Sequence, residues 1–349
     1  MRALVKTATG PGGLELLDVE RPVPGPGEVL IGMRAAALCG TDLHIAAGTM
    51  PVRPPLVLGH ELAGVVVELG PGVAWPPVGQ RVTTETDAFF CGVCAFCRAS
   101  DQHRCPERLA IGTTVAGGLA DVVAVPAAGV HLLPDGVDFA PGALTEPLAV
   151  AVRAVVERGV IESGETVVVI GPGTIGLLVA QVALSRGAEV TVAGLARHEG
   201  RFRLARRLGV TQTAALDRPA EVDAIRSGPD GLGIDVVVEC SGAPDAVAAG
   251  LRLLRKGGRL ILVAFTPGRT VPIDLNLVVQ QEVSIVASRG KRPNCFRLAL
   301  DLLATEAVQT APLISHRLPL DRWEEAFDVA GRSGTKVVVE IGADDPEGR

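Results

Sequence analysis

Tyrosine is absent from this sequence, and aromatic residues make up only 3% of its 349 positions. A core of ordinary size must therefore be mainly aliphatic. With 48% of the residues hydrophobic and 21% charged, there is enough apolar surface to build one. The chain is too long for one ordinary domain and suits two of about 150 residues each. We expect a two-domain protein with an aliphatic core.

Three further features are missing, and each absence excludes a class of protein. No run of about 18 apolar residues is free of a charge or a Gly/Pro break, so we expect no membrane span. The N-terminus MRALVKTATGPGG has no long apolar run and no cleavage-site pattern, which argues against a signal peptide. The formal charge of −6 disfavours nucleic acid as a partner, because phosphate binding needs a basic surface. We expect a cytoplasmic protein with reduced cysteines.

The texture of the chain changes twice. Residues 1–145 are rich in Pro and Gly and contain short apolar runs such as 62-LAGVVVEL-69, which indicate an antiparallel β domain. Residues 146–287 alternate apolar strands with helix-length segments, which predicts βαβ units around a parallel sheet. The tail, residues 288–349, is too short for a core of its own and is expected to complete the first domain. The predicted fold class is α/β, a doubly wound parallel sheet beside a mostly β domain.

A glycine-rich turn follows the strand expected at residues 166–170. It reads GPGTIG, contains Gly171, Gly173 and Gly176, and leads into a helix. A GxGxxG match is weak in a chain with 42 glycines, but a strand before it and a helix after it are typical of a dinucleotide site. The glycines allow a close approach of the backbone to a pyrophosphate, which the helix N-terminus also favours. The alternative is a glycine-rich turn in an α/β domain that binds no ligand.

The end of the second strand indicates which dinucleotide to expect. In NAD-binding domains an acidic residue about 20 positions after the glycine motif binds the ribose 2′-hydroxyl. Gly194 stands at that position, followed by Arg197, His198 and Arg201. Guanidinium groups pair well with a 2′-phosphate, so the sequence favours NADP over NAD. The alternative is that the arginines belong to a solvated helix face, and Glu199 could still supply the missing carboxylate.

Four of the seven cysteines lie between positions 91 and 105. In a reducing compartment, four thiolates at this spacing can close a tetrahedron around one zinc ion and leave no position for a substrate. We therefore expect a structural zinc, with an iron–sulfur cluster as the alternative. The four expected ligands are Cys91, Cys94, Cys97 and Cys105.

A second candidate metal set is marked less densely. Cys39 opens the segment CGTDLH, and His60 and Glu61 lie together in GHE. One thiolate, one imidazole and one carboxylate form a mixed set of the kind that leaves a zinc position open for water or substrate. Glu146 could approach the same metal, or it could place a negative charge at a helix N-terminus. Taken singly, each residue also has an ordinary explanation, such as a core cysteine or a surface His–Glu pair.

Together these motifs resemble the zinc-containing medium-chain dehydrogenase/reductase family, most closely its polyol (sorbitol-like) and threonine dehydrogenase branch. The resemblance covers essentially the whole chain. It rests on motifs in the family's order: CGTDLH (39–44), GHE (59–61), the cysteine cluster, TEPLAVAVRAV (145–155), GPGTIG (171–176) and ECSG (239–242). It implies a Rossmann domain at residues 146–287 and a GroES-like catalytic domain formed by 1–145 and 288–349.

The resemblance implies an enzyme that oxidises a secondary alcohol, polyol or sugar-like, to a ketone with NADP or NAD. The catalytic zinc would be held by Cys39, His60 and Glu61, with Glu146 as an occasional ligand. Thr41 and His44 would form a proton relay. Further expected cofactor contacts are Thr174, Ile175, Arg201, Ser241, Val263, Ala264, Phe265, Ser288 and Arg289.

The resemblance also implies one catalytic and one structural zinc per subunit and a homo-oligomer, tetrameric or dimeric. The identity of the alcohol stays open, because Ile45 stands where sorbitol-type enzymes tend to carry an aromatic residue. One alternative is a threonine-type amino-alcohol dehydrogenase. Another is a cofactor-binding protein of the same fold without enzymatic activity.

Overall fold

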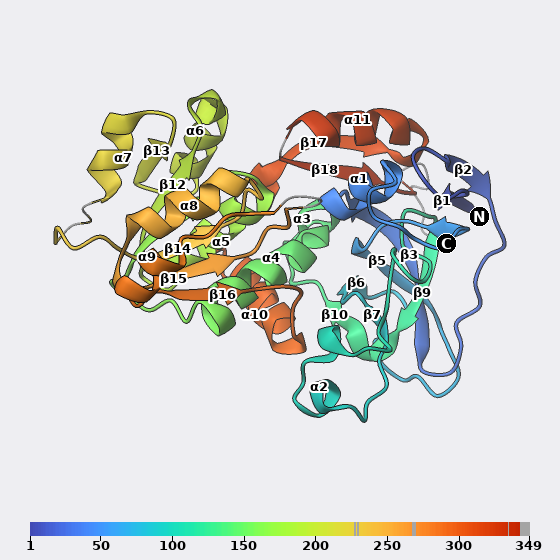
Figure 1. The fold of residues 1–349 in the computed structure, drawn as a ribbon. Helices are drawn as coiled ribbons and strands as arrows, with labels where there is room; N and C mark the ends of the chain where they lie inside the picture. Colours follow the sequence, from blue (N-terminus) through green and yellow to red (C-terminus); the bar gives the residue numbers. More distant parts are fainter. Residues whose placement is uncertain (227, 229, 267–269, 334, 343–349) are drawn as a thin grey trace. The chain divides into compact units, whose positions relative to one another are not determined.

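The computed structural model describes the chain except residues 227, 229, 267–269, 334 and 343–349 (Figure 1). The chain forms two compact units. The first comprises Met1–Glu146, Arg292–Ala304 and the segment from Thr310 onward, and the second comprises Pro147–Lys291 and Thr305–Gln309.

The division differs in detail from the expected one, since residues 288–291 and 305–309 group with the second unit. Hydrogen bonds explain this grouping. The backbone N–H of Ser288 donates to the carbonyl of Leu262 at 2.9 Å, and that of Gln309 donates to Oε1 of Gln181 at 2.8 Å.

The first unit is built on two sheets. A three-stranded sheet has the order β2-β1-β4, and a seven-stranded sheet has the order β10-β6-β5-β3-β18-β17, with β9 also paired to β3. Its strands are β1 (Arg2–Lys6), β2 (Leu14–Asp18), β3 (Glu28–Ala37), β4 (Leu56–Val57), β5 (Glu61–Leu69), β6 (Arg81–Thr84), β9 (Val122–Pro126), β10 (Val130–Leu132), β17 (Ile314–Pro319) and β18 (Lys336–Glu340). The core between them is almost entirely aliphatic, as the composition requires; its members include Leu30, Ile31, Leu62, Val66 and Val339.

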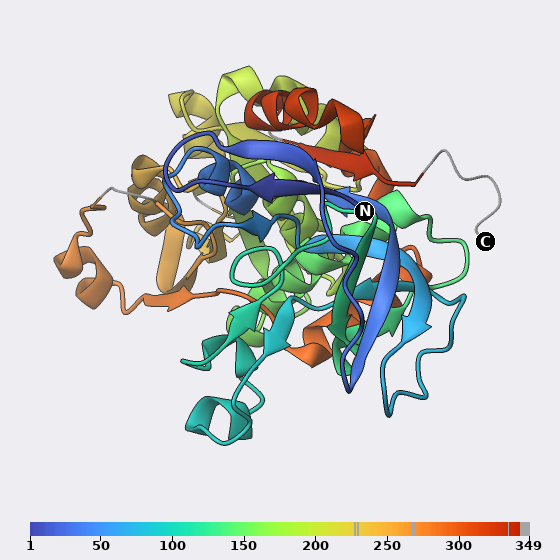
Figure 2. The ribbon, with the colours of Figure 1, turned by 90° about the vertical axis from the view of Figure 1, so that its right-hand side faces the viewer.

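Shorter elements complete this unit. The strands β7 (Asp87–Phe89) and β8 (Leu109–Ala110) pair beside the cysteine cluster. The α-helices are α1 (Gly40–Ala46), α2 (Ala95–Arg98), α3 (Phe139–Ala143), α10 (Pro293–Ala304) and α11 (Trp323–Ser333), and α4 (Thr145–Val152) begins at the boundary of the unit. The C-terminal strand β18 pairs with β3 near the N-terminus, so the red and blue parts of the chain lie side by side in Figure 2.

The second unit holds one parallel sheet of six strands in the order β13-β12-β11-β14-β15-β16. The strands follow one another outward from β11 to β13 on one side and continue from β14 to β16 on the other side. This strand order is that of the Rossmann fold. The strands are β11 (Thr166–Ile170), β12 (Glu189–Gly194), β13 (Gln212–Ala215), β14 (Ile234–Glu239), β15 (Leu254–Leu262) and β16 (Ser284–Ala287). The helices are α5 (Thr174–Ser185), α6 (Glu199–Arg207), α7 (Pro219–Arg226), α8 (Pro244–Leu253) and α9 (Leu275–Gln280), and a π-helical turn spans Arg153–Arg158.

Continuous apolar strands explain the parallel sheet. Every residue of β11 is buried, and β12 is buried from its second residue on, as expected where helices cover both faces. Among the described helices, none combines the length and the apolar character that a membrane crossing requires.

Candidate metal centres and dinucleotide site

The sheet of the first unit brings three potential metal ligands together. Strand β3 lies between β5 and β18, and Ala37 at its end pairs with Glu61 on one side and with Val338 on the other. Cys39 follows β3 as the N-cap of α1, and His60 precedes β5. As a result the ligand atoms of Cys39, His60 and Glu61 all lie within 4.8 Å of one another.

A ring of polar groups surrounds this set. Asp42 is fully buried; its Oδ2 accepts a hydrogen bond from the Cys39 N–H at 2.9 Å, and its Oδ1 lies 3.7 Å from Nδ1 of His60. The buried Lys336 donates from Nζ to Oε1 of Glu61 at 2.7 Å and to the carbonyl of Leu38 at 3.0 Å.

Three buried atoms in this ring lack a hydrogen-bond partner: Oδ1 of Asp42, Nδ1 of His60 and Oε2 of Glu61. An unsatisfied buried polar atom costs about 1–3 kcal/mol, so such a cluster calls for a bound ligand. The donor set of one sulfur, one nitrogen and one carboxylate oxygen suits Zn²⁺. The residues therefore fit the metal ion that the sequence predicts.

The charge balance of the cluster also favours a cation. Burial alone would lower the pKa of His60, but the charges of Asp42, Cys39 and Glu146 raise it to about 10. Burial, with Glu146 nearby, raises the pKa of Glu61, although Lys336 opposes the shift. In the same cluster the pKa of Lys336 is raised despite its burial, because acidic groups surround the ammonium. The site thus carries more negative than positive groups and stabilises added positive charge.

Glu146 occupies the first turn of α4 and is buried. Its charge acts on both His60 and Glu61, which places it near the cluster. Its oxygens are not part of the compact ligand set formed by Cys39, His60 and Glu61 in the described part of the chain. It therefore stands outside the inner set in this structure.

The expected relay residues lie on α1, directly after Cys39. Thr41 is half-buried, and His44 is exposed at the end of the helix. The ring Nδ1 of His44 lies 3.0 Å from the hydroxyl of Thr49, and that hydroxyl donates to the carbonyl of His44 at 3.2 Å. Because the hydroxyl donates elsewhere, Nδ1–H can donate to it and leave Nε2 free to accept a proton.

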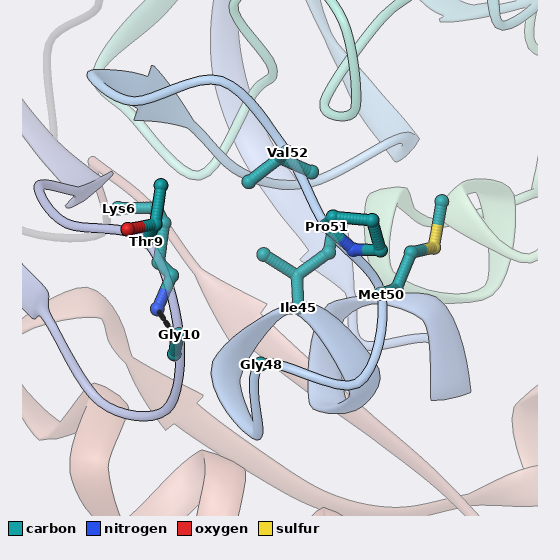
Figure 3. A pocket seen from close by; sticks show the side chains of 8 residues that line it. All are labelled: Lys6, Thr9, Gly10, Ile45, Gly48, Met50, Pro51 and Val52. Carbon is teal, nitrogen blue, oxygen red and sulfur yellow. Dashed lines mark hydrogen bonds between the residues drawn. The ribbon is translucent and has the colours of Figure 1, made fainter.

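A small pocket lies beside the C-terminal end of α1 (Figure 3). Its volume is about 60 Å³, which is far below the several hundred Å³ typical of ligand sites. Nζ of Lys6 donates to the carbonyls of Gly10 and Gly12 there, so its charge is satisfied by the backbone. The pocket is lined by Lys6, Thr9, Gly10, Ile45, Gly48, Met50, Pro51 and Val52.

The second predicted metal set is equally compact. The sulfurs of Cys91, Cys94, Cys97 and Cys105 all lie within 4.8 Å of one another. Backbone N–H groups of Val93 and Cys94 lower the pKa of Cys91 to about 7, whereas burial and the neighbouring thiols raise that of Cys97 to about 12. Four thiols this close cannot all ionise without a cation between them, so the set fits a metal ion with a closed shell. Arg292, the residue before α10, donates a hydrogen bond from Nε to Oδ1 of Asp101 at 2.6 Å. This bond links α10 to the loop that carries the four cysteines.

In the second unit, two glycines of the GPGTIG turn are required by close contacts. Gly171 has a φ of +106°, and a Cβ on it would lie 2.8 Å from the backbone nitrogen of Ser241. A Cβ on Gly176 would lie only 1.9 Å from the carbonyl oxygen of Gly171. Gly173 is the N-cap of α5, which begins at Thr174 and continues with Ile175. The turn therefore has the bare backbone that a pyrophosphate needs.

Glu239, the last residue of β14, forms several hydrogen bonds at the carboxyl end of the sheet next to this turn. Its buried carboxylate accepts hydrogen bonds from the N–H groups of Ser241 at 2.7 Å and Gly242 at 3.0 Å. Its carbonyl accepts from the N–H groups of Val263 and Ala264 at 3.0 and 3.3 Å. The N–H of Cys240 also donates to the carbonyl of Ile170 at 2.8 Å, which joins β14 to β11. The predicted contacts Gly171, Ser241, Val263 and Ala264 therefore converge at the carboxyl ends of neighbouring strands.

The remaining predicted contacts are less tightly defined. Phe265 is 72% exposed beside Ala264, Ser288 is buried after β16, and Arg289 follows it. At the end of β12, Arg197 and Arg201 are close enough that burial and the charge of Arg197 together lower the pKa of Arg201. Oε1 of Glu199, the acidic residue nearby in sequence, pairs with Arg206 at 3.2 Å.

Three residues of the sites were missed by sequence reasoning. Asp42 could have been found, since it lies three positions after the N-cap Cys39, where an acidic side chain caps a helix. Glu239 lies at the end of an apolar run and gave only a weak signal. Lys336 gave none, because 275 residues separate it from Glu61.

Comparison with known proteins agrees with this geometry. Residues 25–135 match the family model of the alcohol dehydrogenase GroES-like domain, and residues 174–305 match that of zinc-binding dehydrogenases. The chain is 37% identical to a sorbitol dehydrogenase of Halalkalibacterium halodurans, covering 97% of this chain and 98% of that protein. It is 35% identical to a D-arabitol-phosphate dehydrogenase of Enterococcus avium, covering 97% of each. An L-threonine 3-dehydrogenase of Bacillus velezensis is also 35% identical, covering 97% of this chain and 99% of that protein.

Among solved structures, a zinc-binding dehydrogenase from Sinorhizobium meliloti bound to NADP has a TM-score of 0.89 at 34% identity, covering 97% of this chain and 98% of that one. The chain belongs to the zinc-binding dehydrogenases of the alcohol dehydrogenase family. It is an oxidoreductase with a GroES-like and a Rossmann part, so the predicted family, fold class and type of enzyme are confirmed.

Proposed function

We propose that the protein oxidises a secondary alcohol of the polyol or sugar-like class to a ketone, with NADP preferred over NAD. The observation that carries this proposal is the set formed by half-buried Cys39 and buried His60 and Glu61, whose ligand atoms lie within 4.8 Å of one another. Relatives named as sorbitol and D-arabitol-phosphate dehydrogenases support the class of substrate.

Cys39, His60 and Glu61 would hold the catalytic zinc, with Glu146 as an alternate ligand. When bound, zinc supplies Lewis acidity that lowers the pKa of an alcohol and polarises a ketone, and the dinucleotide accepts or returns the hydride. Asp42 places a negative charge 3.7 Å from Nδ1 of His60, and Lys336 donates a hydrogen bond to one oxygen of Glu61. Thr41 and His44 carry the released proton outward, with Thr49 fixing the His44 ring so that Nε2 receives it.

The preference for NADP rests on the end of β12. No acidic side chain is available at Gly194, and Glu199 pairs with Arg206. The guanidinium groups of Arg197 and Arg201 lie near each other after the end of β12, and such a pair of charges suits a 2′-phosphate. The Sinorhizobium meliloti structure, which contains NADP, supports this choice.

We further propose two zinc ions per chain, with the one at Cys91, Cys94, Cys97 and Cys105 purely structural. All seven cysteines are free of disulfide bonds, and we propose a cytoplasmic location. We also propose a homodimer or homotetramer. Strand β16 lies at the edge of its sheet with only β15 as a partner among the described strands, and Leu275 and Val279 on α9 are 69% and 74% exposed.

A threonine-type amino-alcohol dehydrogenase is the second candidate, because the Bacillus velezensis relative carries that activity in its name. Purified protein should be tested with polyols, sugar alcohols, simple secondary alcohols and L-threonine, each with NADP⁺ and NAD⁺. The proposal predicts the highest kcat/KM for a polyol-type secondary alcohol with NADP⁺. A higher kcat/KM for L-threonine would favour the second candidate, and turnover of neither class would contradict both.

A further inference from the structure

The position that selects between NAD and NADP is closed by a neighbouring side chain. Gly194 is the last residue of β12, and a Cβ on it would lie 2.9 Å from Nδ1 of His198 and 2.9 Å from Cδ of Pro172. Cβ atoms essentially never approach other heavy atoms this closely. Any side chain at position 194 therefore requires both the imidazole ring and the proline ring to give way.

The imidazole is held in place by the backbone of its own turn. The N–H of Leu195 donates to Nδ1 of His198 at 3.1 Å, and the N–H of His198 donates to the carbonyl of Leu195 at 2.8 Å. Since Nδ1 is the acceptor, the neutral ring carries its proton on Nε2. Burial and the nearby charges of Arg201 and Arg197 lower the pKa of His198, which favours this neutral form.

Two other acidic groups near this turn already have a partner for one carboxylate oxygen. Oε1 of Glu199 lies 3.2 Å from Arg206, and Oδ1 of Asp217 accepts a hydrogen bond from the N–H of Ala196 at 2.8 Å. Position 194, the last residue of β12, is where the family pattern places the carboxylate for a ribose 2′-hydroxyl, and glycine supplies none there.

We propose that His198 is a specificity-determining residue of the dinucleotide site: its ring, fixed by Leu195, fills the space over Gly194 that an acidic side chain would need in order to bind a ribose 2′-hydroxyl. This inference rests on the proposed NADP-dependent function and deepens it. It also means that an acidic residue at position 194 is insufficient by itself to convert the chain to NAD.

Two double-mutant cycles test the role of His198. In the first, Gly194→Ala and His198→Ala are made singly and together, and thermal unfolding and the Kd for NADPH are measured. Gly194→Ala adds only the Cβ, so we expect it to lower Tm in the wild-type background and to lower it less once the ring is gone, when only the contact with Pro172 remains. Such coupling is expected for residues in direct contact. Additive effects on Tm would show that the ring does not close the position.

In the second cycle, Gly194→Asp replaces Gly194→Ala, and binding of NADH and NADPH is followed by fluorescence titration. Gly194→Asp alone should leave the Kd for NADH no tighter than in the wild type. Together with His198→Ala it should tighten NADH about tenfold and weaken NADPH, since a charged hydrogen bond to the ribose is gained. Equal tightening by Gly194→Asp alone would overturn the inference.

Gly194→Asp combined with Pro172→Ala is the matched control, because Pro172 is the other group in contact with position 194. Tightening of NADH in this variant but not with His198→Ala would assign the obstruction to Pro172 and overturn the role of His198. Because binding is measured without an alcohol, the outcome does not depend on the substrate. A wild type that binds neither dinucleotide would contradict the proposed function, and this inference with it.

Discussion

Nζ of Lys336 lies 2.7 Å from Oε1 of Glu61, and both side chains are buried. This ion pair joins the C-terminal strand β18 to the proposed zinc ligands. The other carboxylate oxygen of Glu61, Oε2, has no hydrogen-bond partner and could bind the metal ion. Lys336 is thus a positioning residue for the metal site, although it belongs to none of the motifs from which the site was predicted.

Lys336→Met should destabilise the protein and lower its zinc content. Removing one member of a buried ion pair leaves the other charge uncompensated, at a cost of about 3–5 kcal/mol. Urea unfolding and metal analysis of the purified variant check this result. Lys336→Arg keeps the charge and should retain more zinc than Lys336→Met. Equal zinc content and equal stability in all three proteins would contradict the positioning role.

Cys39→Ala should abolish alcohol oxidation and remove one of the two zinc ions while the fold remains. The thiol supplies the only sulfur in the mixed ligand set, so its loss leaves two of the three inner ligands. Metal analysis, circular dichroism and turnover together check this prediction. Cys295→Ala is the control, since Cys295 is a buried core residue outside both metal sets. It should keep both zinc ions and its turnover, whereas unchanged turnover in Cys39→Ala would refute the catalytic assignment.

Cys94→Ala should remove the other zinc ion and lower Tm without preventing NADPH binding. The four sulfurs lie in the first unit, and the glycine turn lies in the second. Three remaining thiols cannot complete the closed tetrahedron, so the loop loses its cross-link. Calorimetry, metal analysis and NADPH titration of the same preparation measure the three quantities. Full zinc content in this variant would disprove a four-cysteine site.

Gly176→Ala should weaken NADPH binding severely or prevent folding, because the added Cβ would lie 1.9 Å from the carbonyl oxygen of Gly171. Gly200→Ala is the matched control, since its Cβ would meet only the far end of Arg203 at 3.8 Å. In helix α6 that change should be neutral or stabilising, by up to about 1 kcal/mol. Tm and the Kd for NADPH of both variants provide the comparison. Similar behaviour of the two would argue against a close-packed turn.

Asp235 should stabilise the second unit in a pH-dependent manner. Burial alone would raise its pKa, but hydrogen bonds from Thr166 and Arg255 bring the pKa below the ordinary 3.8. A lowered folded-state pKa contributes stability that is fully present above pH 3.8 and is lost as the pH falls through the folded value. Asp235→Asn should therefore cost about 1–2 kcal/mol at pH 7 and progressively less below pH 4. A urea-midpoint difference independent of pH would contradict this.

Much of the second unit could be predicted, because its strands are continuous apolar runs separated by glycines. The strand expected at 166–170 is β11, Thr166–Ile170, and the apolar run 235-DVVVEC-240 lies largely in β14, Ile234–Glu239. The segment 245–258, which follows this apolar strand and has the length of a helix, is helical only in part. Helix α8 ends at Leu253, and β15 begins at Leu254, which pairs with Ile234. Gly257, with a φ of +72°, lies in the irregular stretch of β15 between Leu254 and Arg259.

The composition of the metal sets could be predicted from ligand type and spacing, since Cys39, His60 and Glu61 lie in short motifs. Their surroundings could not. The contact of Lys336 with Glu61 depends on the pairing of β18 with β3, which no local pattern encodes. The crowding of Gly194 by His198 depends on the rotamer of one ring in a short turn. In both cases the missing information is tertiary.

The most direct test of the account is the absorbance of reduced nicotinamide when wild-type protein and Cys39→Ala, each with known zinc content, are mixed with NADP⁺ and a polyol. We predict that the wild type holds two zinc ions and reduces NADP⁺, and that Cys39→Ala holds one and does not. Reduction of NADP⁺ at the wild-type rate by the variant would contradict a reaction centred on Cys39, His60 and Glu61.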